Sequence, residues 1–323
     1  MDTLLYLSAE DVETVGPSMA EMIELLESAF REKGAGRVEM PPKPGIHPGG
    51  GDNFIHAMPA YIPAQQAAGI KWVGGFPDNP PRGLPYISGL LILNDPETGV
   101  PLVVMDCGWI TARRTGAATA VAAKYLARTN SSTVGILACG VQGRTNLEAL
   151  RAILPLTHVR AYDLHRHVAE RYAREMSRHL ELEIEVVDEP ERAVRGCDVV
   201  VTSGPIQKTP HATIRAGWLE EGAFASLVDF DSYWHAAALA EIDTVCTDDL
   251  AQFLYYRETG FFQNTPEIHA DLGELATGRK TGRSSASERT MTINLGLAME
   301  DMVVARQIYL RAVEEKRGVA LPR

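Results

Sequence analysis

The sequence predicts an α/β protein whose main element is a doubly wound parallel sheet of the Rossmann type. From Ser132 onward, short apolar strands alternate regularly with helices, which is typical of a parallel sheet covered on both faces. The first of these strands leads into the glycine turn Ala138-Cys-Gly-Val-Gln-Gly143. More than a hundred residues precede this turn, so a separate segment must come before the sheet.

The composition is ordinary for a globular protein and excludes several classes of function. The chain has 323 residues, of which 45% are hydrophobic and 23% charged, and its net charge is −11. This acidity disfavours nucleic acids and anionic membrane surfaces as partners. No apolar run approaches the roughly 18 residues that span a bilayer, and the N-terminus lacks a signal-peptide pattern, so we expect a cytoplasmic protein. Four scattered cysteines, and nine histidines without ligand spacing, predict reduced thiols and no metal site.

Two helices are expected near the N-terminus. Ser8–Asp11 and Ser18–Glu21 both have the capping-box form, and Gly34 should end the second helix. Residues 38–68 are rich in proline and glycine and predict short strand-like pieces. Further strands are expected at 70–73, 89–93 and 101–105, with a turn at 94–99.

A long helix is expected from about Thr111 to Leu126. It is crowded with glycine and alanine, which indicates either close burial against another backbone or simply high helix propensity. Beyond it, candidate strands lie at 133–138, 159–163, 182–187, 198–202, 223–228 and 243–247. A last helix should run from about Gly296 to Glu315.

The turn after the first strand of the parallel sheet is a candidate nucleotide site. A helix that opens near Gln142 presents unpaired N–H groups and a positive dipole end, which can hold a diphosphate. The turn reads Ala138-x-Gly140-x-x-Gly143, so alanine replaces the first glycine of the usual fingerprint. An ordinary strand–helix turn is therefore the alternative interpretation.

An acidic residue at the end of the next strand favours NAD over NADP. A carboxylate at Asp163, about twenty residues after the turn, can bind the adenosine ribose and would repel a 2′-phosphate. Arg166 could offset that repulsion, so NADP stays the lesser possibility. Ser203, after the fourth strand, is expected to border the nicotinamide ribose. The expected cofactor contacts are thus Ala138, Gly140, Val141, Gln142, Asp163, Arg166 and Ser203.

Several motifs, in order along nearly the whole chain, resemble the ornithine cyclodeaminase/mu-crystallin family. They are Lys71-Trp-Val-Gly-Gly-Phe-Pro-Asp-Asn79, Gly83-Leu-Pro85, Asp106, Thr111, Arg114-Thr-Gly-Ala117, Gly140-Val-Gln142 and Gly296-Leu-Ala-Met-Glu-Asp301. The resemblance implies an NAD-binding Rossmann domain at 116–301 and a smaller α+β substrate-binding and dimerisation domain at 1–115 with 302–323. It also implies a homodimer, a small amino or imino acid as substrate, and Thr115 as a further cofactor contact.

A substrate carboxylate next to the carbon that exchanges hydride needs fixed cations. By resemblance, Lys71 and Arg114 match the family's carboxylate-binding lysine and arginine, and Lys71 is expected to take part in catalysis. Lys43 stands where the family commonly has an arginine and is a third candidate for substrate binding. For each cation the alternative is a solvated surface charge, although the apolar neighbours of Lys71 favour burial of its stem.

A carboxylate near the reacting nitrogen can carry the proton that accompanies hydride transfer. Asp231 aligns with the aspartate that the family places near the substrate amine, and it is expected to be catalytic. Asp229 stands where a glycine is common, and two like charges so close would raise one pKa. The alternative is that both aspartates cap a helix that begins at Tyr233.

Three functions stay open, and the preferred one is an NAD(H)-dependent oxidoreductase that acts on the CH–NH or C=N bond of a small amino or imino acid. The N-terminal half has more cations than one carboxylate needs, which indicates a second acidic group, as in iminosuccinate reduced to aspartate: Lys43, His47, His56, Lys71, Arg82, Arg113 and Arg114. The second function is an ornithine cyclodeaminase-type ammonia lyase. Tyr86, an expected substrate contact, stands where cyclodeaminases carry a threonine, and this difference disfavours the lyase. The third is a binding protein that kept the nucleotide site.

Overall fold

The computed structural model describes residues 3–322, which divide into two compact units. Unit 1 consists of the residues up to Arg114 together with those from Gly296 onward, and unit 2 is Thr115–Leu295. The sequence placed the second boundary at 301/302, inside a single helix, α10 (Ala298–Glu314). In the structure α10 packs against strands of the unit 1 sheet, and all of it falls in unit 1.

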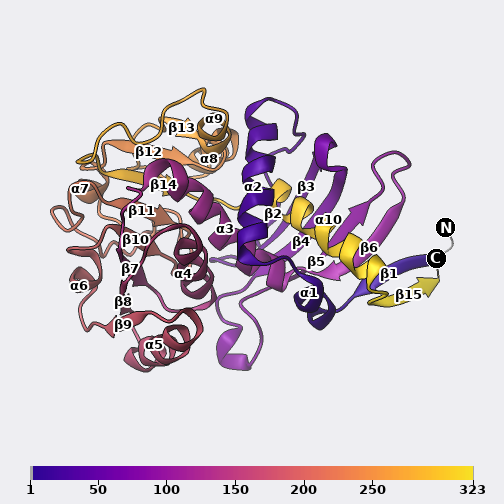
Figure 1. The fold of residues 1–323 in the computed structure, drawn as a ribbon, viewed down its shortest axis with the longest axis horizontal. Coiled ribbons are helices and arrows are strands. Elements are labelled where there is room, and N and C mark those ends of the chain that lie inside the picture. The colour runs from indigo at the N-terminus through magenta and orange to yellow at the C-terminus, as the bar shows by residue number, and fades with distance from the viewer. Residues whose placement is uncertain (1–2, 323) are drawn as a thin grey trace. The chain divides into compact units, whose positions relative to one another are not determined.

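Unit 1 is built on a mixed sheet that, within residues 3–322, has seven strands in the order β15-β1-β6-β5-β4-β3-β2 (Figure 1). The strands are β1 (Thr3–Leu7), β2 (Gly45–Ile46), β3 (Phe54–Ile62), β4 (Ala67–Gly75), β5 (Ile87–Asn94), β6 (Pro101–Asp106) and β15 (Val319–Pro322). The strands predicted at β4, β5 and β6 are confirmed. The sequence missed β1 and β15, which pair with each other at one edge, and it expected only short pieces where β3 runs for nine residues.

Helices cover one face of this sheet. They are α1 (Ala9–Val15), α2 (Met19–Gly34) and α10, with short 3-10 turns η1 (Pro63–Gln65) and η2 (Pro80–Arg82) in the loops. Both predicted capping boxes are present: the hydroxyls of Ser8 and Ser18 accept from the backbone N–H three residues on. The long helix α10 packs against β3, β4 and β5 and against α2 (Figure 1).

The two faces of the unit 1 sheet differ in burial. Strand partners share a face, and Lys71, Leu91 and Met105, which stand in register on β4, β5 and β6, are fully buried. On the opposite face, Trp72 stands in register with Leu90, and these side chains are 49% and 46% exposed. A sheet normally buries an apolar face, so this second face is a candidate contact surface.

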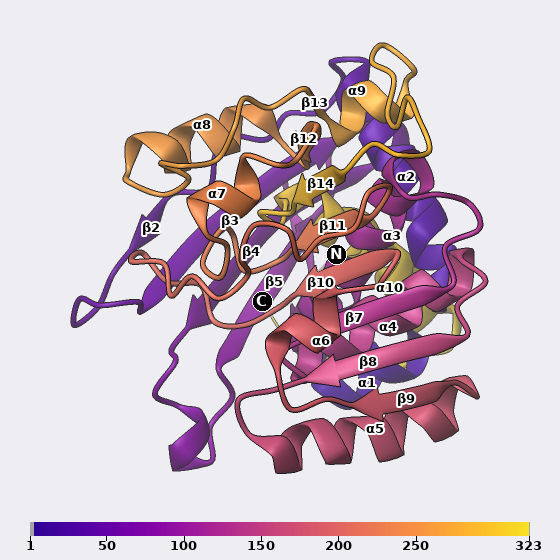
Figure 2. The ribbon, with the colours of Figure 1, turned by 90° about the vertical axis from the view of Figure 1, so that its left-hand side faces the viewer.

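Unit 2 is built on a sheet whose described strands are all parallel, in the order β13-β12-β14-β11-β10-β7-β8-β9 (Figure 2). They are β7 (Thr133–Leu137), β8 (His158–Tyr162), β9 (Glu183–Val186), β10 (Val199–Thr202), β11 (Phe224–Leu227), β12 (Thr244–Thr247), β13 (Ala270–Asp271) and β14 (Thr290–Ile293). All six predicted strands are confirmed. The sequence missed β13 and β14, and β14 lies between β11 and β12. The order reverses between β7 and β10, so the doubly wound prediction is confirmed.

The helices of unit 2 are α4 (Val141–Ile153), α5 (Arg166–Leu180), α6 (Pro190–Val194), α7 (Ala236–Leu239), α8 (Leu250–Glu258) and α9 (Leu272–Ala276), joined by most of α3 (Gly108–Leu126). The small residues of α3 serve close packing, because a Cβ on Gly116 would lie 2.4 Å from the carbonyl oxygen of Thr145 on α4. A buried polar group joins α3 to the sheet: the Thr119 hydroxyl lies 2.8 Å from that of Ser226 on β11 and accepts from the amide of Asn294, the residue after β14, at 3.1 Å. Among residues 3–322, no helix is long and apolar enough to span a bilayer.

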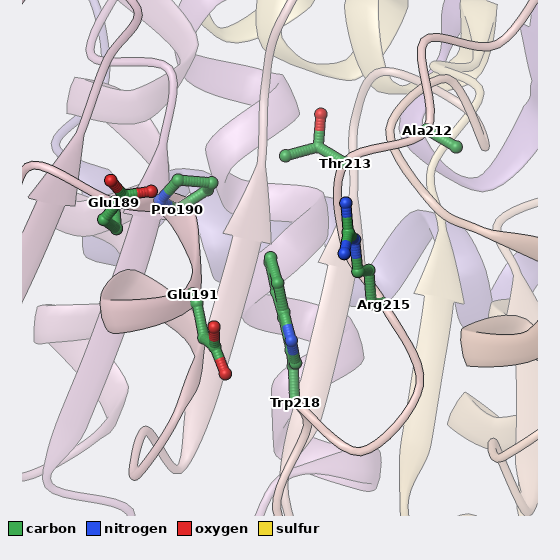
Figure 3. Close-up of a pocket in the computed structure, with 7 residues that line it drawn as sticks. All are labelled: Glu189, Pro190, Glu191, Ala212, Thr213, Arg215 and Trp218. Carbon is green, nitrogen blue, oxygen red and sulfur yellow. The ribbon is translucent and has the colours of Figure 1, made fainter.

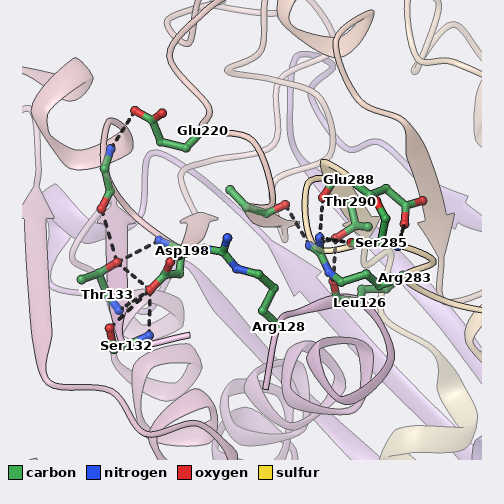
Figure 4. Close-up of polar contacts among 12 residues, drawn as sticks. Leu126, Arg128, Ser132, Thr133, Asp198, Glu220, Arg283, Ser285, Glu288 and Thr290 are labelled. Carbon is green, nitrogen blue, oxygen red and sulfur yellow. Dashed lines mark hydrogen bonds and ion pairs between the residues drawn. The ribbon is translucent and has the colours of Figure 1, made fainter. Parts of the chain in front are cut away.

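One carboxylate and two guanidinium groups hold the amino end of the unit 2 sheet together (Figure 4). Asp198, just before β10, accepts from the backbone N–H groups of Ser132 (2.8 Å) and Thr133 (3.1 Å) and pairs with Arg128. Arg283 donates to the carbonyl oxygens of Leu126 and Ala223 (2.7 and 3.2 Å). Burial raises the pKa of Asp198, but these hydrogen bonds and Arg128 outweigh burial and lower it below 3.8.

The Asp198→Asn variant should have a free energy of unfolding about 1–3 kcal/mol below that of the wild type at pH 7, because the amide cannot accept all of these hydrogen bonds. It should therefore unfold at a lower temperature. The pKa is lower in the folded state, so the carboxylate stabilises the fold above about pH 4, and this contribution disappears as the pH falls through the folded pKa. Thermal melts between pH 3 and 7 should show the two proteins converging in acid. Asp188→Asn, at an exposed position of the same unit, is the control and should change little. A pH-independent difference would contradict the assignment.

Candidate active site

A buried group of charges lies between the sheet and α10 in unit 1. The Lys71 ammonium, 0% exposed, lies 2.7 Å from Oδ2 of Asp301 and donates to the Thr111 hydroxyl at 3.3 Å. Arg114 donates to the other carboxylate oxygen of Asp301 at 3.1 Å and to Glu300 at 2.9 Å. Lys71 and Arg114 are therefore brought together by a shared carboxylate, and the surface-charge alternative is wrong for both.

Lys43 belongs to the same unit and is also buried. Its ammonium donates to the carbonyl oxygen of Gly296 at 3.1 Å. Gly296 has φ +77°, and a Cβ there would lie 2.6 Å from the Arg114 guanidinium. A side chain at this position would strain the backbone and displace the arginine, so glycine is required where Lys43 and Arg114 approach the start of α10.

Burial acts in opposite directions on the cations and carboxylates of this group. Burial lowers the pKa of Lys71, and the neighbouring negative charge of Asp301 acts in the opposite direction by raising it. Burial raises the pKa of Glu300, and the positive charge of Arg114 lowers it. Each charged form therefore depends on its partner, and the loss of one partner would leave an uncompensated buried charge.

The sequence did not assign a role to Glu300, Asp301 or Thr111, although all three lie in the quoted motifs. Glu300 and Asp301 are adjacent acidic residues inside the apolar run of α10 and are both 0% exposed. Two carboxylates in a stretch that is otherwise buried require cationic partners. That local contrast is the signal from which their pairing could have been predicted.

The predicted nucleotide turn has the backbone of a dinucleotide fingerprint. Ala138 has φ +75°, the left-handed region where the first fingerprint glycine normally lies. A Cβ on Gly140 would meet nothing within 4 Å, whereas one on Gly143 would lie 2.5 Å from the carbonyl oxygen of Ala138. Gly140 thus leaves open space in front of the thirteen-residue helix α4, which has no side-chain cap, and Gly143 allows close helix–strand packing. Val141 and Gln142 form the first turn of that helix.

Asp163 follows β8 and borders the same turn. Its carboxylate accepts from the backbone N–H groups of Cys139 and His165, both at 2.9 Å. Arg166 is the first residue of α5, and it pairs with Glu170 at 2.9 Å and with Asp188. The charge of Arg166 is therefore already paired with two exposed carboxylates.

Ser203 joins the end of β10 to the nucleotide turn. Its hydroxyl donates to the carbonyl oxygen of Ala138 at 2.9 Å, and its N–H donates to Leu137 at 3.0 Å. Thr115 is a buried residue of α3 at the start of unit 2. Tyr86 is half-buried immediately before β5 in unit 1, and burial raises the pKa of its phenol.

The two aspartates after β11 are both buried. Asp229 is 0% exposed, and burial raises its pKa to about 7; Asp231 is 5% exposed, and burial also raises its pKa. The Thr265 hydroxyl lies 3.5 Å from Asp231. No helix begins at Tyr233: the next one, α7, is preceded by His235 without a side-chain cap. The helix-capping interpretation is therefore wrong.

Unit 2 also contains a hollow of about 380 Å³ beside α6 (Figure 3). It is lined by Glu189 and Glu191 on one segment and by Thr213, Arg215 and Trp218 on another. Two carboxylates against one guanidinium make this a poor site for a diphosphate. The open helix N-terminus at Gly140 is the better candidate for that group.

Comparison with known proteins places nearly the whole chain in one family. The model of the ornithine cyclodeaminase/mu-crystallin family matches residues 3–316. An alanine dehydrogenase of Archaeoglobus fulgidus is 37% identical over 98% of both chains. Among solved structures, the NADH and L-proline complex of Thermococcus litoralis Δ1-pyrroline-2-carboxylate reductase is 32% identical, with a TM-score of 0.89 over 98% of this chain and 100% of that one. An archaeal alanine dehydrogenase dimer with bound NAD is 35% identical, with a TM-score of 0.88 over 99% of both. The chain belongs to the ornithine cyclodeaminase/mu-crystallin family.

Proposed function

We propose that this protein is an NAD(H)-dependent oxidoreductase that acts on the CH–NH or C=N bond of a small α-amino or α-imino acid. The observation that carries the proposal is the buried cation pair of Lys71 and Arg114 in a chain that also has a dinucleotide fingerprint. Alanine dehydrogenase and pyrroline-2-carboxylate reductase, two relatives that span the full chain, support it.

The residues around the nucleotide turn fit a dinucleotide. The space in front of Gly140 is open to backbone approach, and the uncapped N-terminus of α4 offers N–H groups to a diphosphate. Val141, Gln142 and Ser203 would border it, with Asp163 at the adenosine ribose and Thr115 as a further contact. When bound, NAD accepts or supplies the hydride.

The charges beside Asp163 favour NAD over NADP. A 2′-phosphate would be repelled by this carboxylate. Arg166, the nearby cation that would offset this repulsion, is paired with Glu170 and Asp188. The proposed cofactor is therefore NAD.

The charge balance of the buried group in unit 1 favours a substrate with one carboxylate. Lys43, Lys71 and Arg114 supply three positive charges, and Glu300 with Asp301 supplies two negative ones, so three minus two leaves one. The larger excess that the sequence indicated shrinks further because burial lowers the pKa of His56 to about 3, which keeps it neutral. One bound carboxylate neutralises the group; in this role Lys71 and Arg114 hold the substrate, with Lys43 beside them.

Asp231 is proposed to carry the proton of the reaction. Its raised pKa lets it hold a proton closer to neutral pH than an exposed aspartate does. In the reducing direction the carboxyl gives that proton to the imine nitrogen, and in the oxidising direction the carboxylate removes one from the amine.

Mixing the protein and NADH with Δ1-pyrroline-2-carboxylate, or with pyruvate or oxaloacetate plus ammonia, should lower the NADH absorbance with at least one monocarboxylate. L-Proline or L-alanine with NAD should give the reverse signal. Reduction with the dicarboxylate alone would contradict the charge balance. No NADH loss with any compound, together with NAD-dependent release of ammonia from ornithine, would overturn the oxidoreductase in favour of a cyclodeaminase. Failure to act on any compound, with nucleotide binding retained, would favour a binding protein.

Lys71→Met should raise the KM for the acid substrate by about 10- to 100-fold, because a charge-assisted hydrogen bond to the carboxylate is lost. Arg114→Lys keeps the charge but loses the planar fork and should have a smaller effect in the same direction. Lys280→Met makes the Lys71 substitution at an exposed position and should leave KM unchanged. Steady-state kinetics on variants that melt cooperatively are the measurement. An unchanged KM in both site variants would remove these residues from substrate binding.

We further propose that the chain forms a homodimer through the open face of the unit 1 sheet. This face carries large apolar side chains from β1, β4 and β5, among them Tyr6, Trp72 and Leu90, which are 37–49% exposed. The other face of the sheet is already covered by helices, so the second copy of the chain would pack against the exposed apolar face. The dimeric state of the related alanine dehydrogenase structure supports this arrangement.

Trp72→Asp should convert the dimer into a monomer, since it places charge in the middle of this face, and sedimentation velocity should show the loss of mass. Leu164→Asp, at an 80% exposed leucine of unit 2, is the matched control and should remain dimeric. A Trp72→Asp dimer as stable as the wild type would place the interface elsewhere.

A further inference from the structure

Asp229 is a buried acid to which the proposed reaction gives no task. It lies two residues before Asp231, just beyond the end of β11, and its side chain is fully buried. A carboxyl group in such a place is stable only if it is hydrogen-bonded. Its partners therefore indicate what it does.

The carboxylate of Asp229 joins two strand ends. One oxygen accepts from the hydroxyl of Thr202, the last residue of β10, at 2.7 Å. The other accepts from the backbone N–H of Gly204 at 2.9 Å. Thr202 stands in register with Leu227, so Asp229 bridges the carboxyl ends of β10 and β11.

Gly204 is held from the other side as well. A Cβ on Gly204 would lie 2.6 Å from the Tyr233 hydroxyl, which in turn donates to the carbonyl oxygen of Pro205 at 3.0 Å. The preceding residue, Ser203, donates to Ala138 in the nucleotide turn. A continuous chain of contacts thus runs from Asp229 through Gly204 and Ser203 to the proposed cofactor site.

The backbone fixes Asp229 and Asp231 relative to each other. Phe230 between them has φ +60°, a conformation that costs a non-glycine residue about 1–2 kcal/mol. Its ring packs on Tyr256 and Phe262 with centroids 5.1 and 4.9 Å away, which offsets this cost. The Ser232 hydroxyl closes the turn by donating to the carbonyl oxygen of Asp229 at 2.6 Å.

We propose that Asp229 is a positioning residue: it holds Gly204 and Ser203 in place against the nucleotide turn, and so sets the affinity for the dinucleotide, without touching the reacting atoms. This inference rests on the proposed function. The hydrogen bonds can form with a neutral group too, since a carboxyl or carboxamide oxygen can accept from Gly204 while the neighbouring O–H or N–H donates to the Thr202 hydroxyl.

The experiment is a fluorescence titration of NADH into the purified wild type and variants, each with a thermal melt. Asp229→Ala, which removes both hydrogen bonds, should raise the Kd for NADH by about tenfold or more. Asp229→Asn should bind within about threefold of the wild type. Should Asp229→Ala fail to fold, Asp229→Ser, whose hydroxyl is too short to bridge both partners, replaces it with the same expectation.

Two comparisons separate positioning from general destabilisation. Asp198→Asn disturbs the opposite, amino end of β10 and should lower the melting temperature without changing the Kd. Asp231→Asn should lower kcat with little change in the Kd. Equal NADH affinity in Asp229→Ala and the wild type would overturn this inference but leave the proposed function standing. A loss of NADH affinity in Asp198→Asn as large as that in Asp229→Ala would have the same consequence. A wild type that binds no NADH would overturn the proposed function as well.

The pH dependence of stability gives a readout that needs no ligand. Burial raises the pKa of Asp229 to about 7, while Thr202 and Gly204 lower it and Asp231 adds a like charge; Arg257 acts on Asp231 from α8. A raised folded pKa means that Asp229 stabilises the fold below about pH 4, and this contribution is lost as the pH rises through about 7. The wild type should therefore lose stability relative to Asp229→Asn between about pH 4 and 7. Parallel melting curves would show that Asp229 is not buried as described.

Discussion

The ion pairs around Asp301 are the constraint on which unit 1 depends. Two cations and two carboxylates are removed from water there, and a buried charge without a partner would cost several kcal/mol. Lys71 comes from β4 and Arg114 from α3, whereas both carboxylates come from α10. The pairing fixes the rotation of α10 over the sheet, because a slip of one residue would turn both carboxylates by about 100°. Under the proposed function the same cations hold the substrate, so fold and binding share residues.

The sequence predicted unit 2 more completely than unit 1. Apolar strands separated by helices have a strong periodic signal, and β7 to β12 lie where that pattern placed them. The strand β14, Thr290–Ile293, alternates threonine with apolar residues and enters the middle of the sheet from a distant part of the chain, so local pattern did not reveal it. In unit 1, β1 and β15 pair over a separation that only the tertiary fold establishes.

The candidate residues could be named from motifs, but their pairings could not. Lys71 and Arg114 were identified, yet the carboxylate that joins them lies far along the chain. Two residues at the proposed sites also break local rules, since Ala138 and Phe230 take left-handed conformations that usually need glycine. Such departures are expected where a site imposes its own geometry, and neighbouring packing must compensate for them.

Unit 2 is an insertion within unit 1, which has a consequence for the order of folding during synthesis. Arg114 and Asp301 are 187 residues apart. At 5–20 residues per second, roughly 10 to 40 seconds pass before the ribosome delivers the partner of Lys71 and Arg114. Unit 2 is complete when Leu295 emerges, so it can fold first. The N-terminal sheet must wait for α10 with its cations unpaired and an apolar face uncovered, the stage at which the nascent chain most needs protection from aggregation.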